Sequence, residues 1–234
     1  RVDDRGAGAS TGQQTYNQAT TADLAGDTRA QVEWLRRRPE VDPARIALVG
    51  HSEGATIATF VAAADPRIAA VVTMAGAGKR GDSVLVDQLD DILSRNETLT
   101  AEQRAQAQAQ QREAFRTLRA GGEVPGETRT VWMRAFIDFD PIPTVRRVRQ
   151  PLLILQGALD RQVTAPQAAA LAEAARAAGN PDVTVTVFPS LNHLFLPAKT
   201  GAFSEYSTLD TTTLGPDVLG TLADWLAVRL RAAH

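Results

Sequence analysis

The pentapeptide G-H-S-E-G at residues 50–54 lies between a short apolar run and an alanine-rich stretch. The apolar run, 45–50, lacks polar alternation, which is typical of a strand buried on both faces of a parallel sheet. The stretch 54–64 favours a helix that ends before an Asp-Pro pair. A G-x-S-x-G motif between a strand and a helix is typical of a nucleophile elbow, which exposes a serine on a sharp turn. The motif therefore predicts helices packed on a sheet and a nucleophile at one strand end.

The rest of the chain continues this alternation, and we expect an α/β fold with a mostly parallel sheet and flanking helices. The expected strands are 45–50, 68–74, 151–156 and 183–187, and the expected flanking helices are 22–38, 54–64, 165–178 and 216–231. Between 76 and 150 the pattern changes to helices alone, at 82–95, 100–120 and 127–139. Such an interruption predicts a helical cap (77–150) inserted in one catalytic domain (1–76 and 151–234), over the carboxyl edge of the sheet.

The elbow also predicts where an oxyanion could bind. The turn is so tight that the positions two before and two after the serine must be small, and Gly50 and Gly54 meet that demand. The backbone N–H of Glu53 comes at the start of the following helix, where it can face a negative oxygen. We therefore expect Ser52 as the nucleophile and the Glu53 N–H as one oxyanion donor.

The general base follows from the histidine count, since a serine hydroxyl needs a neighbouring base. Only His51, His193 and His234 occur. His51 adjoins the serine and is poorly placed to take its proton, so we interpret it as a residue packed near the site. His234 is the last residue. His193 follows the last expected strand, which makes it the predicted base.

The acid that orients the base should come after a strand, between serine and histidine in the chain. Asp160 follows the strand 151–156 and meets this condition, whereas the rivals Asp138 and Asp140 follow no strand. Asp160 would hold the imidazole in one tautomer without taking its proton. The order Ser52, Asp160, His193 distinguishes this arrangement from the other well-known orders of such residues.

Composition excludes several classes of site. The chain has 234 residues, no cysteine and a net charge of −2, so thiolate chemistry and charge-driven binding to nucleic acid or an anionic membrane are not expected. With so few histidines, a metal site is not expected either. We expect no cofactor and no apolar stretch long enough to span a membrane.

Several motifs together resemble bacterial α/β-hydrolase esterases related to the serine aminopeptidase-like group. They are D-R-G-A-G-A-S at 4–10, G-H-S-E-G at 50–54, M-A-G-A-G at 74–78, F-D-P-I-P at 139–143, G-A-L-D-R-Q-V at 157–163 and L-N-H-L-F at 191–195. The resemblance implies a carboxylesterase for short acyl chains that uses Ser52, Asp160 and His193. It also implies that the cap helices shape the acyl and alcohol pockets.

The start of the chain departs from that family, in which the segment matching 4–10 follows a fourth strand. The three strands before it, and the loop that gives a second oxyanion donor, are not found in this sequence. We therefore expect the N-terminal strands and the second donor to lie outside this chain, leaving one edge of the strand 45–50 unpaired. A homodimer, an upstream segment or a rearranged compact form could cover that edge. A cytoplasmic location is favoured, although secretion stays open because any signal would lie upstream.

Two other functions stay open beside hydrolysis of a small-molecule ester. An aminopeptidase or amidase of the same fold would need a carboxylate for the substrate ammonium, and the expected cap offers Asp82, Asp87, Asp90 and Asp91. A catalytically impaired binding module would keep the fold without the activity. Acidic runs of this kind are usually solvated faces, and the complete set of Ser52, Asp160 and His193 argues against a module without activity, so the esterase is preferred.

Overall fold

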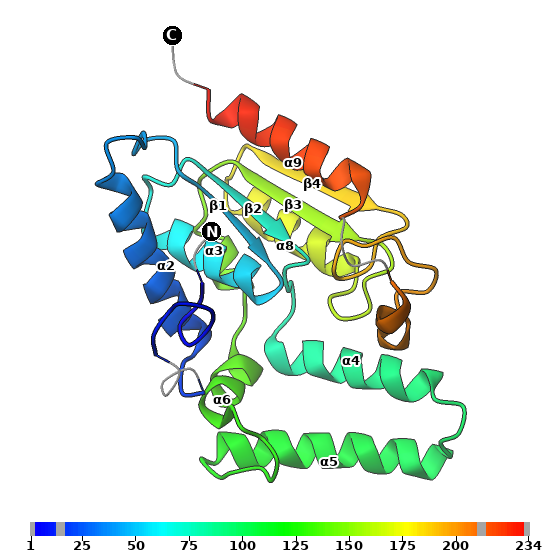
Figure 1. Cartoon of the computed structure of the whole chain (residues 1–234). Helices are drawn as coiled ribbons and strands as arrows, with labels where there is room; N and C mark the ends of the chain where they lie inside the picture. The colour runs from blue at the N-terminus through cyan, green and yellow to red at the C-terminus, as the bar shows by residue number, and fades with distance from the viewer. Residues whose placement is uncertain (1–2, 13–16, 210–213, 232–234) are drawn as a thin grey trace.

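A four-stranded parallel sheet forms the centre of the molecule, in a computed structural model that describes residues 3–12, 17–209 and 214–231 (Figure 1). The strands pair in sequence order, β1-β2-β3-β4. Their bounds are β1 Ala47–His51, β2 Ala70–Met74, β3 Leu152–Gly157 and β4 Val183–Phe188. The strands lie within one or two residues of the sequence prediction, which confirms the expected parallel α/β fold.

Helices cover both faces of this sheet. They are α2 Thr21–Arg36, α3 Glu53–Ala64, α7 Ile142–Val145, α8 Pro166–Ala177 and α9 Pro216–Arg229. Figure 1 shows α2, α3 and α8 on one side and α9 on the other. On the first side, residues of α3 and α8 such as Val61 and Leu171 join one core cluster, whereas Val218 and Trp225 of α9 join the other. The sheet is thus the middle layer of three.

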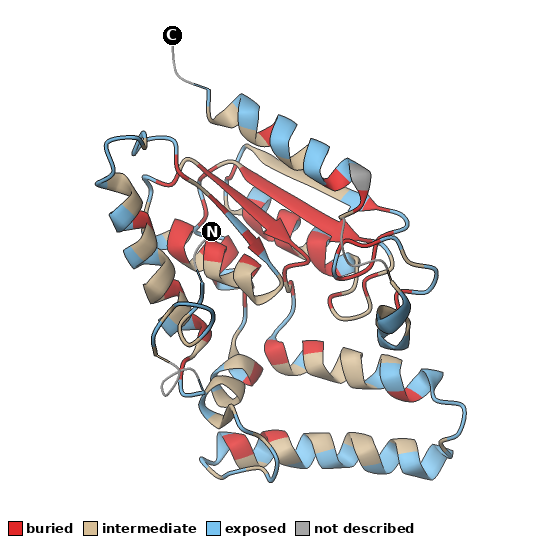
Figure 2. Cartoon of the chain, in the orientation of Figure 1, coloured by how far each residue is buried: buried red, intermediate tan, exposed pale blue. Residues whose placement is uncertain are grey.

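Burial along the strands follows their place in the sheet. All residues of β2 and β3 are buried (Figure 2), because these apolar strands have neighbours at both edges and helices on both faces. β1 pairs only with β2 among the described residues, and Val49 is 47% exposed. The expected open edge of this strand is therefore present. A groove of about 950 Å³ runs along it between α2, β1 and α3.

Three helices, α4 Gly81–Arg95, α5 Ala101–Arg119 and α6 Thr130–Asp138, lie apart from the sheet layers (Figure 1). They have a small core of their own, made by Phe115, Leu118 and Ile137. Outside Phe115 and Leu118, no residue of α5 is buried, which suits its polar sequence. We call these three helices the α4–α6 unit. They match the helices that the sequence predicted between 76 and 150.

Two short elements were not predicted. The helix α7 follows Asp140, whose side chain accepts a hydrogen bond from the Ile142 N–H at 2.9 Å, so a local Asx turn and not a periodic pattern precedes it. The 3-10 helix η1 spans Phe203–Thr208. Too few residues are involved in either for apolar periodicity to reveal them. None of the helices in the described part of the chain combines the length and apolar character needed to cross a bilayer.

Candidate active site

Ser52 lies on the sharp turn between β1 and α3. Its backbone has φ 56° and ψ −118°, a left-handed conformation that non-glycine residues rarely adopt. The Ser52 N–H donates to the Met74 carbonyl at 2.8 Å, which ties the turn to the next strand. The strain is thus held by neighbouring structure, as strained functional residues generally are.

The two elbow glycines serve different purposes. A Cβ at Gly50 would overlap the backbone carbonyl of Gly54, so a side chain cannot fit at Gly50 without moving the turn. A Cβ at Gly54 would meet no heavy atom within 4 Å. The prediction that a side chain cannot fit is therefore confirmed at Gly50 and wrong at Gly54. The close contact in the turn is between position 50 and the backbone of Gly54, whereas the Cβ position of Gly54 faces open space.

The structure brings Ser52, His193 and Asp160 into one chain of hydrogen bonds. His193 Nε2 lies 3.1 Å from Ser52 Oγ, and His193 Nδ1 lies 2.9 Å from Asp160 Oδ2. Both His193 and Asp160 are buried, at 4% and 2% exposure. Since an ionised carboxylate can only accept, Nδ1 carries the proton, which leaves Nε2 free to accept from the serine hydroxyl.

Asp160 is held by more than His193. Its Oδ1 accepts the backbone N–H groups of Gln162 and Val163, each at 2.8 Å. Its Oδ2, which faces His193, also accepts a hydrogen bond from Nε2 of Gln156 at 2.9 Å. The carboxylate therefore has four hydrogen bonds, counting the one to His193, and its orientation is fixed on both oxygens.

Gln156 was not singled out from the sequence. It is fully buried at the end of β3, and the same Nε2 also donates to the Val163 carbonyl at 2.8 Å. Its Oε1 has no donor among the described residues. The sequence did contain a signal, because Gln156 is a glutamine in an otherwise apolar strand, next to the loop of the predicted acid Asp160. A buried polar group in such a strand needs hydrogen-bond partners.

His51 packs against the base, as expected. Its ring lies 4.9 Å from that of His193, centroid to centroid, and its Nε2–H donates to the backbone carbonyl of His193 at 2.7 Å. Burial lowers the pKa of His51 below its usual value, so the ring is neutral at pH 7. His51 thus holds the backbone that carries His193.

The rival acids are engaged elsewhere. Asp138 accepts from Arg119 at 2.8 Å, and Asp140 accepts from the backbone N–H of Ile142 at 2.9 Å. His234 lies outside the described residues. Within the described part of the chain, no three histidine, aspartate or glutamate side chains are grouped as a metal site would require.

Glu53 is the first residue of α3, so its N–H has no partner within the helix. It adjoins Ser52, and the N-terminus of the helix adds a favourable potential for an anion. The Glu53 side chain also makes contacts that the sequence did not indicate. Its Oε1 accepts from Trp132 Nε1 at 2.6 Å and from Thr21 Oγ1 at 2.7 Å.

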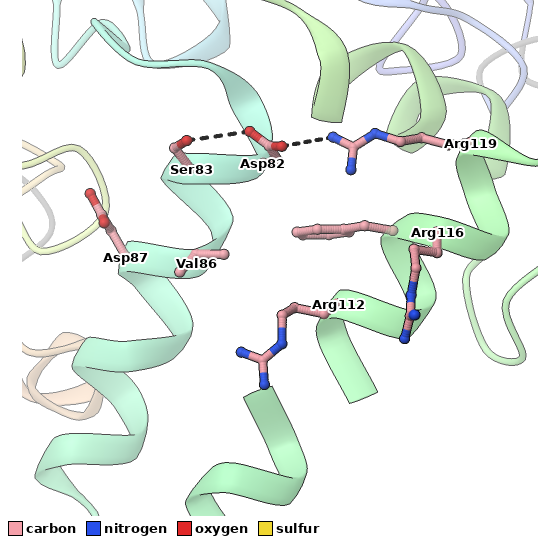
Figure 3. A pocket seen from close by; sticks show the side chains of 8 residues that line it. Asp82, Ser83, Val86, Asp87, Arg112, Arg116 and Arg119 are labelled. Atoms are coloured by element: carbon pink, nitrogen blue, oxygen red, sulfur yellow. Dashed lines mark hydrogen bonds and ion pairs between the residues drawn. The ribbon is translucent and has the colours of Figure 1, made fainter. Parts of the chain in front are cut away.

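The acidic residues of α4 that the sequence offered for a substrate ammonium all have partners. Figure 3 shows Asp82 directed at Arg119 across the space between α4 and α5, where the pair lies 2.7 Å apart. The partners are Arg80 and Arg119 for Asp82, Lys79 for Asp87, Gln108 for Asp90 and Arg95 for Asp91. The Arg80 guanidinium holds the pKa of Asp82 well below its usual range. None of the four is a lone carboxylate.

Comparison with known families now adds to this geometry. Residues 1–198 match the model of the family described as serine aminopeptidase, S33. The chain belongs to this family. It is therefore a member of the α/β-hydrolase superfamily and a hydrolase, in keeping with the elbow and the parallel sheet.

Solved structures share the fold at low identity. The α/β hydrolase GrgF from Penicillium sp. sh18 has a TM-score of 0.60 and 20% identity, over 97% of this chain and 78% of that one. Acylaminoacyl peptidase from Pyrococcus horikoshii has a TM-score of 0.60 and 15% identity, over 99% and 32%. Acetyl xylan esterase 1 from Thermoanaerobacterium has a TM-score of 0.52 and 19% identity, over 89% and 53%.

Among curated proteins, an uncharacterized protein of Mycobacterium tuberculosis, Rv2307c, is 49% identical over 49 residues. The matched segment is 21% of this chain and 17% of the length of that relative. The similarity is thus local and assigns no activity.

Proposed function

We propose that the protein is a serine carboxylesterase that hydrolyses esters of short acyl chains. The observation that carries the proposal is the hydrogen-bonded series from Ser52 through His193 to Asp160, which starts on a strained elbow. A nucleophile, a base and an orienting acid in this order are what acyl transfer needs. No cofactor is required, because side chains and water supply every proton and electron pair.

In the proposed reaction, His193 takes the Ser52 hydroxyl proton at Nε2 as Oγ attacks the ester carbonyl carbon. The carbonyl π electrons move to its oxygen and give a tetrahedral oxyanion. When this intermediate collapses, the C–O bond to the alcohol breaks and Nε2 returns the proton to the leaving oxygen. A water molecule, deprotonated by His193, then attacks the acyl-enzyme, and Ser52 recovers its proton as the acid leaves.

The Glu53 N–H is the proposed donor to that oxyanion. A single donor removed from such a site typically costs about 10²–10³ in turnover. The proposal makes the α4–α6 unit the cap of the site, with α6 closest to the elbow through Trp132.

An aminopeptidase is the second candidate, favoured by the name of the family. The acidic side chains of α4 argue against it, because each already has a cationic or amide partner that a substrate ammonium would have to displace. They are Asp82, Asp87, Asp90 and Asp91. An ester leaving group needs no such carboxylate. The ester reading is therefore preferred.

The experiment is fluorophosphonate labelling together with hydrolysis of p-nitrophenyl acetate and an aminoacyl anilide. We expect labelling at Ser52, none in Ser52→Ala, and faster turnover of the acetate than of the anilide. A preference for the anilide would favour the aminopeptidase. Folded protein that does not label would indicate a binding module.

A further inference from the structure

The side chain of Glu53 joins three elements that are distant in sequence. It starts from the elbow, at the first residue of α3, and its Oε1 accepts from Thr21 of α2 and from Trp132 of α6. The Trp132 N–H to Glu53 distance of 2.6 Å is short for an N–H donor, as expected when the acceptor is charged. The residue after the proposed nucleophile is therefore bonded directly to the α4–α6 unit.

Trp132 is also held within its own helix. Its ring stacks on Phe136 with centroids 4.7 Å apart and planes 12° apart, and the Arg129 guanidinium lies 4.6 Å from its centroid. These contacts are made by the faces of the indole ring, whereas its N–H group lies on the ring edge. An indole N–H can only donate, and a buried or half-buried one generally finds an acceptor. The acceptor here is Glu53.

A second connection between α6 and the sheet layers lies at the far end of the helix. Phe139, just after α6, stacks on Phe60 of α3 with centroids 5.2 Å apart. An aromatic stack lets the rings slide, whereas a charged hydrogen bond fixes a distance and a direction. The Trp132–Glu53 bond thus sets how close the start of α6 lies to Ser52.

We propose that Glu53 is a positioning residue that selects short acyl chains, by holding Trp132 and with it the α6 wall of the acyl site against the elbow. The inference rests on the proposed esterase function, in which the α4–α6 unit caps the site and α6 borders the acyl group, and it names the selectivity of that function. The backbone N–H and the side chain of one residue would then serve two purposes, the first binding the oxyanion and the second limiting the space beside it. Without the bond, α6 can move away and longer acyl chains can enter.

Kinetics of p-nitrophenyl esters test this proposal through a ratio, kcat/KM for octanoate divided by kcat/KM for acetate. Trp132→Phe removes the N–H but keeps a ring to stack on Phe136, and Glu53→Met removes the acceptor at similar length. We expect either change to raise the ratio about fivefold, mainly through a lower KM for octanoate, and the double variant to raise it no further, since the two residues share one bond.

Two controls separate selection from stability. Glu53→Gln keeps an acceptor for the indole and is expected to keep a ratio near that of the unchanged protein. Trp34→Phe alters a tryptophan on α2 that is 53% exposed and should leave the ratio unchanged. An unchanged or lower ratio in both Trp132→Phe and Glu53→Met, in variants that still label with fluorophosphonate, would overturn the proposal.

A second measurement does not depend on activity. The chain has three tryptophans, so their indole N–H signals can be resolved by ¹⁵N NMR. We expect the Trp132 signal to lie downfield and to exchange slowly, and to approach the exchange rate of exposed Trp34 in Glu53→Met. Rapid exchange of Trp132 in the unchanged protein would also overturn the proposal. If the unchanged protein does not label with the fluorophosphonate, that result would instead count against the esterase function.

Discussion

Replacing Gln156 with methionine is expected to slow the proposed hydrolysis about tenfold. Gln156 directs one N–H at Asp160 and the other at the Val163 carbonyl. Rotating its amide by 180° would bring a carbonyl against two acceptors, so the observed orientation is required. The cost is a buried Oε1 without a donor among the described residues. Methionine has a similar length and no donor, so it removes the hydrogen bonds to Asp160 and to the Val163 carbonyl while keeping most of the buried volume.

The magnitude follows from the contacts of Asp160. A hydrogen bond to a charged acceptor is worth about 1.5–3 kcal/mol, and about 1.4 kcal/mol corresponds to tenfold in rate. Asp160 keeps three other donors, from Gln162, Val163 and His193, which favours the lower end of this range. Loss of the orphaned Oε1 offsets part of the stability cost, so we expect the free energy of unfolding to fall by only about 1–2 kcal/mol.

The assay is the steady-state hydrolysis of p-nitrophenyl acetate, with thermal unfolding measured in parallel. Because Gln156 acts through Asp160, we expect kcat to fall about tenfold while KM changes less than twofold. The matched control is Gln167→Met, a buried glutamine that contacts Gly78 and should lower stability without lowering kcat. If kcat of Gln156→Met stayed within twofold of the unchanged protein, the positioning argument would be refuted.

Three further substitutions test the elbow and a loop near Asp160. Gly50→Ala should lower the free energy of unfolding by about 1–3 kcal/mol because the added Cβ meets the carbonyl of Gly54, whereas Gly54→Ala should not; equal losses in chemical unfolding would contradict this. Backbone N–H groups of 199–201 hold the pKa of Glu205 at about 2, below 4.5 when unfolded. This carboxylate therefore stabilises the fold above pH 4.5 and progressively less as the pH falls toward 2. Glu205→Gln should show a smaller drop in Tm between pH 6 and pH 3, and an equal drop would argue against this role.

The sequence by itself determined the layer architecture and the proximity of the three proposed catalytic residues. Apolar runs without alternation require neighbours on every side, so the strands had to form a buried parallel sheet. Ser52, Asp160 and His193 each follow a strand of that sheet, and the carboxyl ends of parallel strands meet at one edge. Local patterns were therefore enough to predict that these side chains lie together.

Only the tertiary structure decided which further side chains contact them. Glu53 and Trp132 are 79 residues apart, and their hydrogen bond depends on where α6 packs and not on any local pattern. The orientation of Gln156 likewise depends on acceptors supplied by a loop that comes after it. Gly54 shows the same limit, because the space around a Cβ is a property of the packed backbone. Periodicity reports burial along one element, whereas these contacts depend on distances between elements.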